Sequence, residues 1–286
     1  MALEPLESEA HQVSAERVAL VRSQFSLTAF ETATALGVLP FLDRLLTLEA
    51  QVEPGGEGPA LAYVRERRHI TDRITLGMLD VSSTAVEADC EEGRATLLAE
   101  HLQKTVDRRQ GIYTVLGLVG SGVFTIISGE IGVGATNIGV INTANIATVI
   151  GGASELIFGS AALMDTSARR ELHHERNLLR DVWTRENTTF APAVWAFLNR
   201  RLTDEPAQRS LRENLIMRWQ DEGRLGAAGS DMEQHRIELF FGSGGYYTID
   251  ELRARAAMLD LLETDISLMN QGLNRLIREL LKRDKI

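Results

Sequence analysis

The chain of 286 residues contains a single cysteine, Cys90, and only 6% aromatic residues. One cysteine cannot form an intramolecular disulfide or supply a cysteine-rich zinc site, so disulfide scaffolds and zinc fingers are excluded. Excess positive charge is also absent, since the net charge is -10. A negative chain opposes docking on a phosphate backbone, and we expect no nucleic-acid partner. The 44% hydrophobic content is nevertheless too high for wholesale disorder.

The first residues, MALEPLESEAHQVSAERV, lack both a basic region and an apolar region. We therefore expect no secretory signal peptide, and synthesis that ends in the cytosol or at the inner face of a membrane.

Apolar residues recur every three or four positions through most of the chain, which predicts an all-α protein. One amphipathic helix is predicted over 14–36, ending at Gly37, and a short one follows from Pro40. The run EPGGEGP at 53–59 predicts a linker. The next 50 residues contain no proline and few glycines, which predicts one long helix over 60–109.

Further helices are predicted between the middle of the chain and its end. A charged helix is expected over 165–186. The later helix starts are indicated by capping residues, namely Pro192, Asp204 with Pro206, Ser230 with Glu233, and Thr248 with Glu251.

The last helix carries two series of apolar residues spaced by seven, interrupted at Arg255, which is typical of a coiled coil. We call these residues the seam and predict that they bind a partner helix. They are Leu252, Leu259, Leu262, Ile266, Met269, Leu273, Leu276 and Leu280.

The middle segment, 110–164, contains no Lys, Arg or Asp, and its only charges are Glu130 and Glu155. Its two apolar blocks, 111–128 and 142–164, would form helices roughly 27 and 34 Å long, close to the ~30 Å hydrocarbon core of a bilayer. These lengths predict a long antiparallel helical hairpin with a Gly-rich, membrane-inserting tip.

Basic residues flank this segment on both sides, with Arg108 and Arg109 before it and Arg169 and Arg170 after it. By the positive-inside rule, both flanks would lie on the cytoplasmic side, and Tyr113 would lie at the membrane interface.

Polar and small residues within the segment make its helices marginal on their own. Small residues let helices approach closely and polar ones bond between helices, so we expect homo-oligomers. The residues expected in the inserted and oligomerising surfaces are Gly117, Gly120, Ser121, Glu130, Asn145, Thr148, Gly151, Gly152, Glu155 and Gly159, together with Tyr113.

Four regions follow: N-terminal amphipathic helices (1–52), the linker (53–59), the long hairpin (60–187) and a C-terminal helical region (188–286) that completes a bundle with the N-terminal helices. Over 60–186 the pattern resembles the architecture of α-helical pore-forming toxins. The resemblance implies a soluble form that hides the hairpin and an oligomeric form in the membrane. We expect a membrane-associated pore or channel former, or a membrane-anchored scaffold.

Two alternatives stay open. The Gly-rich helices could lie in the core of a soluble bundle, although the flanking helices show single apolar stripes and no surplus apolar face. The protein would then be a soluble helical adaptor or scaffold that acts through the seam.

No group of residues indicates catalysis, a cofactor or a metal, so we expect a non-enzymatic protein. Two Glu-x-x-His patterns, Glu66 to His69 and Glu171 to His174, are of the kind found in di-iron bundles. In the predicted hairpin they lie about 50 Å apart and could not share a metal.

Overall fold

A computed structural model describes residues 13–51, 57–133, 168–201 and 209–283, with side chains omitted at 57 and 113–133. These residues are mostly helical, which confirms the all-α prediction at that level. Backbone contacts divide the chain into two compact units. The first unit comprises Met1–Gly93, His174–Ser243 and Arg255–Ile286, and the second comprises Arg94–His173 and Gly244–Ala254.

The N-terminal region forms three helices, α1 (Ala15–Gln24), α2 (Leu27–Ala35) and α3 (Leu39–Gln51). The prediction of one helix over 14–36 is wrong, because Ser26 begins a new helix by accepting a hydrogen bond from the amide of Ala29. Gly37 separates α2 from α3 with a φ of +66°, a conformation that favours glycine.

The long helix α4 runs without interruption over 77 residues, Glu57–Val133. It confirms the helix predicted over 60–109. It also begins three residues earlier than predicted, so Pro59 of the predicted linker lies in its first turn, where proline is tolerated. Its far end continues five residues past Ser128, the predicted end of the first apolar block.

Two short strands, β1 (Arg170–His173) and β2 (Gly244–Tyr247), form an antiparallel pair in the second unit. The helix predicted over 165–186 is therefore wrong over β1, and among the described residues 168–186 only α6 (Leu178–Thr184) is helical. At Gly244, φ is +91° and a Cβ atom would collide with the carbonyl of Leu172. Glycine at this position thus permits the close strand pairing.

In the rest of the described chain, the helices are α7 (Pro192–Asn199), α8 (Leu211–Asp221), α9 (Asp231–Phe241) and α10 (Ile249–Leu281). The structure confirms three of the four predicted starts, at Pro192, at Ser230 and at the pair Thr248 and Glu251. The fourth predicted start, at Asp204 with Pro206, lies outside the described residues. The described helix α8 is capped by Ser210, which forms a capping box with Glu213.

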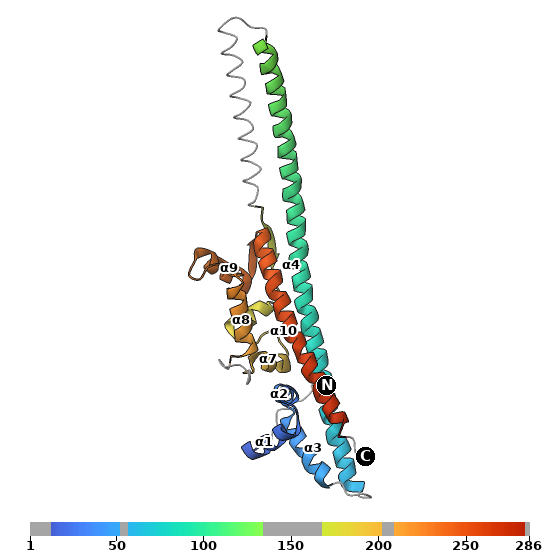
Figure 1. The fold of residues 1–286 in the computed structure, drawn as a ribbon. Helices are drawn as coiled ribbons and strands as arrows, with labels where there is room; N and C mark the ends of the chain where they lie inside the picture. Colours follow the sequence, from blue (N-terminus) through green and yellow to red (C-terminus); the bar gives the residue numbers. More distant parts are fainter. Residues whose placement is uncertain (1–12, 52–56, 134–167, 202–208, 284–286) are drawn as a thin grey trace. The chain divides into compact units, whose positions relative to one another are not determined.

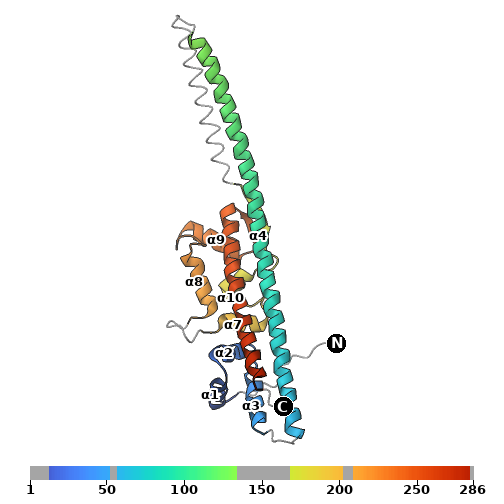
Figure 2. The ribbon, with the colours of Figure 1, turned by 45° about the vertical axis from the view of Figure 1, so that its right-hand side comes forward.

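The core of the first unit lies around α10. In two views, α10 runs beside α4 on one side and beside α8 on the other (Figures 1 and 2). The packing is close enough that a Cβ atom at Gly272 would collide with the Thr32 side chain of α2. A Cβ atom at Gly77 of α4 would likewise collide with the side chain of Leu36 and contact that of Leu273 in α10.

Candidate functional site

The residues predicted to enter a membrane fall in two groups. Five of them belong to the backbone of α4, which is helical throughout this stretch, and these are Tyr113, Gly117, Gly120, Ser121 and Glu130. The other six lie outside the described residues, and these are Asn145, Thr148, Gly151, Gly152, Glu155 and Gly159.

The predicted basic flanks are described at both ends of the middle segment. Arg108 and Arg109 are exposed on α4, immediately before the uncharged sequence begins. Arg169 and Arg170 are exposed where the described chain resumes, and Arg170 is the first residue of β1. All four arginines are therefore accessible to solvent or to a charged surface.

The eight seam residues of α10 are at most 3% exposed. They lie inside this chain, where Leu273 lies near Leu36 and Gly77. A partner helix would have to displace these contacts to reach them. The described structure thus gives the seam an intramolecular packing role.

Arg255, the break in the seam pattern, is completely buried and forms a polar network. Its guanidinium donates to the carbonyl oxygen of Phe240 at 3.0 Å and to Oδ1 of Asn177 at 3.5 Å, and lies 3.6 Å from Glu91 Oε2. Asn177 Nδ2 also donates to the Phe240 carbonyl, at 2.9 Å. The network links α10 to α4, to the cap of α6 and to the end of α9. Sequence patterns showed only that Arg255 interrupts an apolar series.

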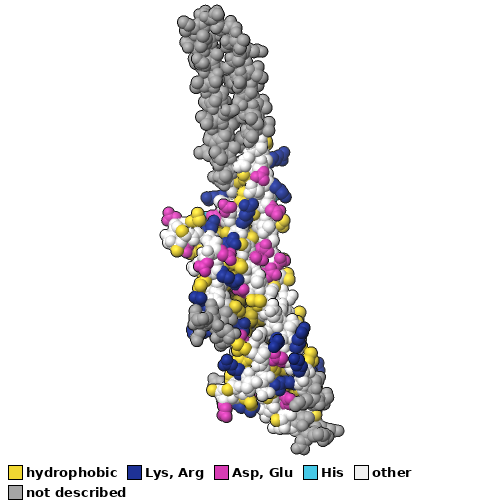
Figure 3. Space-filling model, viewed as in Figure 1, with side chains coloured by type: hydrophobic (Ala, Val, Ile, Leu, Met, Phe, Trp, Pro, Cys, Tyr) yellow, Lys and Arg dark blue, Asp and Glu magenta, His cyan; other side chains and the backbone are white. Residues whose placement is uncertain are grey.

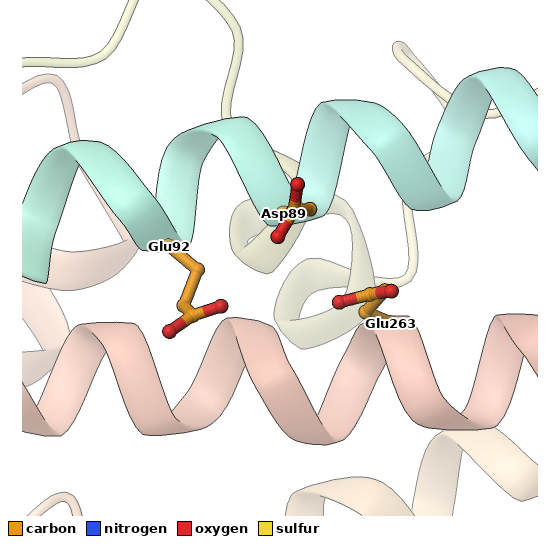
Figure 4. Close-up of side chains that lie close together, drawn as sticks. All are labelled: Asp89, Glu92 and Glu263. Carbon is orange, nitrogen blue, oxygen red and sulfur yellow. The ribbon is translucent and has the colours of Figure 1, made fainter.

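Three carboxylates gather between α4 and α10, namely Asp89, Glu92 and Glu263. Their oxygens lie within 4.8 Å of one another, and Figure 4 shows Glu92 and Glu263 projecting between the two helices beside Asp89. Carboxylate oxygens are ligands of hard cations such as Ca²⁺ and Mg²⁺. Exposed acidic groups of this kind are also common without any ion, so the cluster alone indicates no metal function.

Burial and neighbouring like charges raise the pKa of two members of this cluster, Glu92 and Glu263. Burial, together with the charges of Asp260, Asp89 and Glu263, raises the pKa of Glu92. Burial, together with Asp89 and Asp260, raises the pKa of Glu263. The ionised cluster therefore opposes the approach of α4 and α10 near neutral pH.

Five exposed apolar side chains, which we call the outer stripe, lie on one face of α4. They are Leu61, Val64, Leu76, Leu79 and Val86, which are 51 to 63% exposed. The exposed residues Arg65, Arg68 and Asp72 lie on the same face and interrupt the stripe between Val64 and Leu76. At 100° per residue, these five positions fall within an arc of about 120°. The buried residues Tyr63, Ile70, Ile74, Val81 and Ala88 lie on the opposite face. The continuous apolar face of α4 is therefore the buried one, and the outer face combines apolar side chains with charged ones.

Charge along α4 changes from mainly basic to acidic. Residues 65–73 contain four arginines with Glu66 and Asp72, and residues 80–92 contain five acids without a basic residue. Of these acids, Glu91 lies against Arg255 and Glu92 projects toward α10. On the α4 side of the face drawn in Figure 3, acidic side chains gather above basic ones, with hydrophobic side chains beside them. The sequence contains these blocks plainly, yet their significance depends on knowing which face of α4 is exposed.

The two Glu-x-x-His patterns serve other contacts. Glu66 is buried and lies 3.7 Å from Arg44, whereas Glu171 pairs with His173 at 3.0 Å. Among the described residues, the carboxylates of Asp89, Glu92 and Glu263 are the group positioned to share an ion, and neither pattern belongs to it.

Comparisons with known proteins found no match: no protein family, no curated protein and no solved structure resembles this chain significantly. Within the part of the chain that the structure describes, no helix is both long and apolar enough to cross a bilayer.

Proposed function

We propose that this is a non-enzymatic, membrane-associated helical protein that self-assembles through its middle segment to form a pore or channel, or to anchor a scaffold. Residues 110–164 would insert as a hairpin and contact lipid. The observation that carries this proposal is the continuity of α4, since one unbroken helix leads from the charged sequence at 94–109 into the uncharged sequence. A continuous helix satisfies its backbone hydrogen bonds internally, as a bilayer requires.

The exposed basic residues at both ends of the segment support the proposal. Arg108, Arg109, Arg169 and Arg170 would remain with the phospholipid headgroups on the cytoplasmic side while the Gly-rich tip crosses. A cysteine introduced at Asn137 of a Cys90→Ser variant should then react with an impermeant thiol reagent from the far side of the membrane. Labelling from the cytoplasmic side alone would contradict this topology.

The primary test is to express the full chain without detergent, isolate membranes and wash them with alkaline carbonate. Retention in the pellet is expected, and leakage from liposomes would then distinguish a pore from an anchor. Complete recovery in the soluble fraction would contradict the membrane proposal.

Matched variants sharpen this test. Leu118→Arg and Ile157→Arg place a charge in the two apolar blocks, where insertion scales assign an arginine a cost of about 2.5 to 3.5 kcal/mol. Both should lose carbonate-resistant binding. Met232→Arg, at an exposed apolar position of α9, should retain it. Equal retention by all three variants would argue against insertion of the middle segment.

The second candidate, a soluble helical adaptor, is favoured by a different observation. The outer stripe of α4 offers an exposed apolar surface, whereas the seam does not. Soluble recovery of the full chain, together with loss of partner binding in stripe variants, would support this candidate.

A further inference from the structure

We propose that five basic residues beside the middle segment bind the headgroups of anionic phospholipids, so that the protein selects negatively charged membranes. We call this set the basic collar, and its members are Lys104, Arg108, Arg109, Arg169 and Arg170. The inference rests on the proposed function, because it takes residues 110–164 to meet a bilayer. It goes further by naming the class of lipid that the protein recognises.

On α4, the collar lies where the charged sequence ends. Lys104 and Arg108 are four residues apart and exposed, so they share one side of the helix. The buried residues Leu102 and Val106 lie on the opposite side. Lys104 and Arg109 are separated by about 8 Å along the helix axis, and the headgroup layer on each side of a bilayer is about 5 to 8 Å thick. When the uncharged sequence enters the hydrocarbon core, all three basic side chains therefore reach the headgroups.

The two arginines that follow the middle segment lie at the same level of the second unit. There α10 runs antiparallel to α4 (Figures 1 and 2), and Arg253 of α10 donates a hydrogen bond to Gln103 of α4 at 3.4 Å. Since α10 begins four residues before Arg253, its start lies about level with residue 107 of α4. Arg170 pairs with Tyr247 in the strand pair, directly before that start. Basic residues from both ends of the middle segment thus lie together.

Charge complementarity selects an anionic membrane. Residues 104–109 and 165–171 contain five basic and three acidic residues, whereas the whole chain has a net charge of -10. The described acids Asp107 and Glu171 already have partners inside the chain, a glutamine and a histidine, at 2.8 and 3.0 Å. Each Lys or Arg near an anionic surface strengthens binding roughly fivefold, whereas a zwitterionic surface offers no such net attraction.

The first experiment measures binding of the full chain to two kinds of vesicle by co-sedimentation. One kind is pure phosphatidylcholine, and in the other phosphatidylglycerol replaces a third of that lipid. Binding to the anionic vesicles should be at least about tenfold tighter, and added salt should reduce the preference because it screens the charges. Equal affinity for the two kinds of vesicle would overturn the proposal, and so would an absence of binding to both.

Matched variants assign the preference to the collar. Lys104→Gln/Arg108→Gln removes two exposed charges and should weaken binding to anionic vesicles about 25-fold, with the affinity for phosphatidylcholine unchanged. The control Arg65→Gln/Arg68→Gln removes two exposed charges from α4 outside the second unit and should bind like the wild type. Lys104→Arg should also retain binding, since the charge is preserved. Equal losses in the two double variants would show that the attraction is not localised, and would overturn the proposal.

Carbonate extraction of the same vesicles distinguishes this proposal from insertion itself. Carbonate-resistant protein that prefers anionic vesicles would support both. Release by carbonate, together with weaker binding of the collar variant than of the control, would support the collar and contradict insertion. Carbonate-resistant protein without a preference for anionic vesicles would overturn the collar and leave the proposed function standing.

Discussion

The seam of α10 and the outer stripe of α4 are both series of apolar residues on one side of a helix, yet the structure uses them differently. The seam of α10 is almost completely buried inside the chain, whereas the outer stripe of α4 is more than half exposed. A heptad pattern alone therefore indicates a helix that packs against another helix, but not whether the second helix belongs to the same chain. The difference arises because the first unit covers the continuous apolar face of α4, which includes Ile70, Ile74 and Val81, and leaves the interrupted outer stripe exposed.

The largest expected effect concerns the buried charge of α10. Replacing Arg255 with Met removes the guanidinium and leaves Glu91 and Asn177 without this contact. Loss of one partner in a buried ionic network typically costs about 3 to 5 kcal/mol. Chemical denaturation of Arg255→Met should therefore show a strongly reduced unfolding free energy. An unchanged denaturation midpoint would show that the network contributes little.

The next effect compares the two apolar series directly. Leu262 is completely buried in the seam, and Leu262→Ala should cost about 2 to 5 kcal/mol through lost burial and a residual cavity. Leu79→Ala, on the exposed stripe, should change the stability of the monomer by less than about 0.5 kcal/mol. Thermal melts measure both values. Similar losses in the two variants would mean that the stripe is covered within the monomer.

A matched pair of glycines extends this comparison. Gly272→Ala places a Cβ atom against Thr32 and should cost about 1 to 3 kcal/mol. Gly93→Ala lies on α4 with open space around it, and should stabilise the helix by about 0.5 to 1 kcal/mol. Adding Thr32→Ala to Gly272→Ala should recover part of the loss. Urea titrations should show a lower free energy of unfolding for Gly272→Ala than for the wild type, and a higher one for Gly93→Ala.

The sequence predicted the elements whose signals are local. The long helix of residues 60–109, Pro192 and the capping box at Thr248 all follow from spacing and hydrogen-bonding chemistry within a few residues. The strand pair β1–β2 did not, because its pairing joins residues more than 70 positions apart and β1 is only four residues long. Residue propensities cannot predict so short a strand, because β1 is stabilised by its pairing with β2.

The candidate sites show the same limit. Asp89, Glu92 and Glu263 come together only because α4 and α10 pack in one particular register. The outer stripe of α4 could not be predicted from the sequence, because charged residues such as Arg68 and Asp72 lie on the same face and only the structure shows which side of the helix is exposed.

The smallest expected effect concerns the carboxylates between these two helices. The pKa of Glu263 is raised in the folded protein by burial and by Asp89 and Asp260. Below its unfolded pKa this group is protonated in both states and carries no penalty. As the pH rises through the folded pKa, the carboxylate ionises beside other acids and the folded state loses stability.

Glu263→Gln should therefore stabilise the protein near neutral pH by a few tenths of a kcal/mol, about the size of a like-charge contact on a helix surface. The gain should diminish as the pH is lowered, because the wild-type carboxyl then becomes neutral as well. Melting temperatures of Glu263→Gln measured across this pH range, beside an exposed control such as Glu238→Gln, would detect the trend. A gain that is independent of pH would show that packing, and not charge repulsion, causes the difference in stability between Glu263→Gln and the wild type. The contrast between the two sides of α4 would then depend on its apolar residues alone.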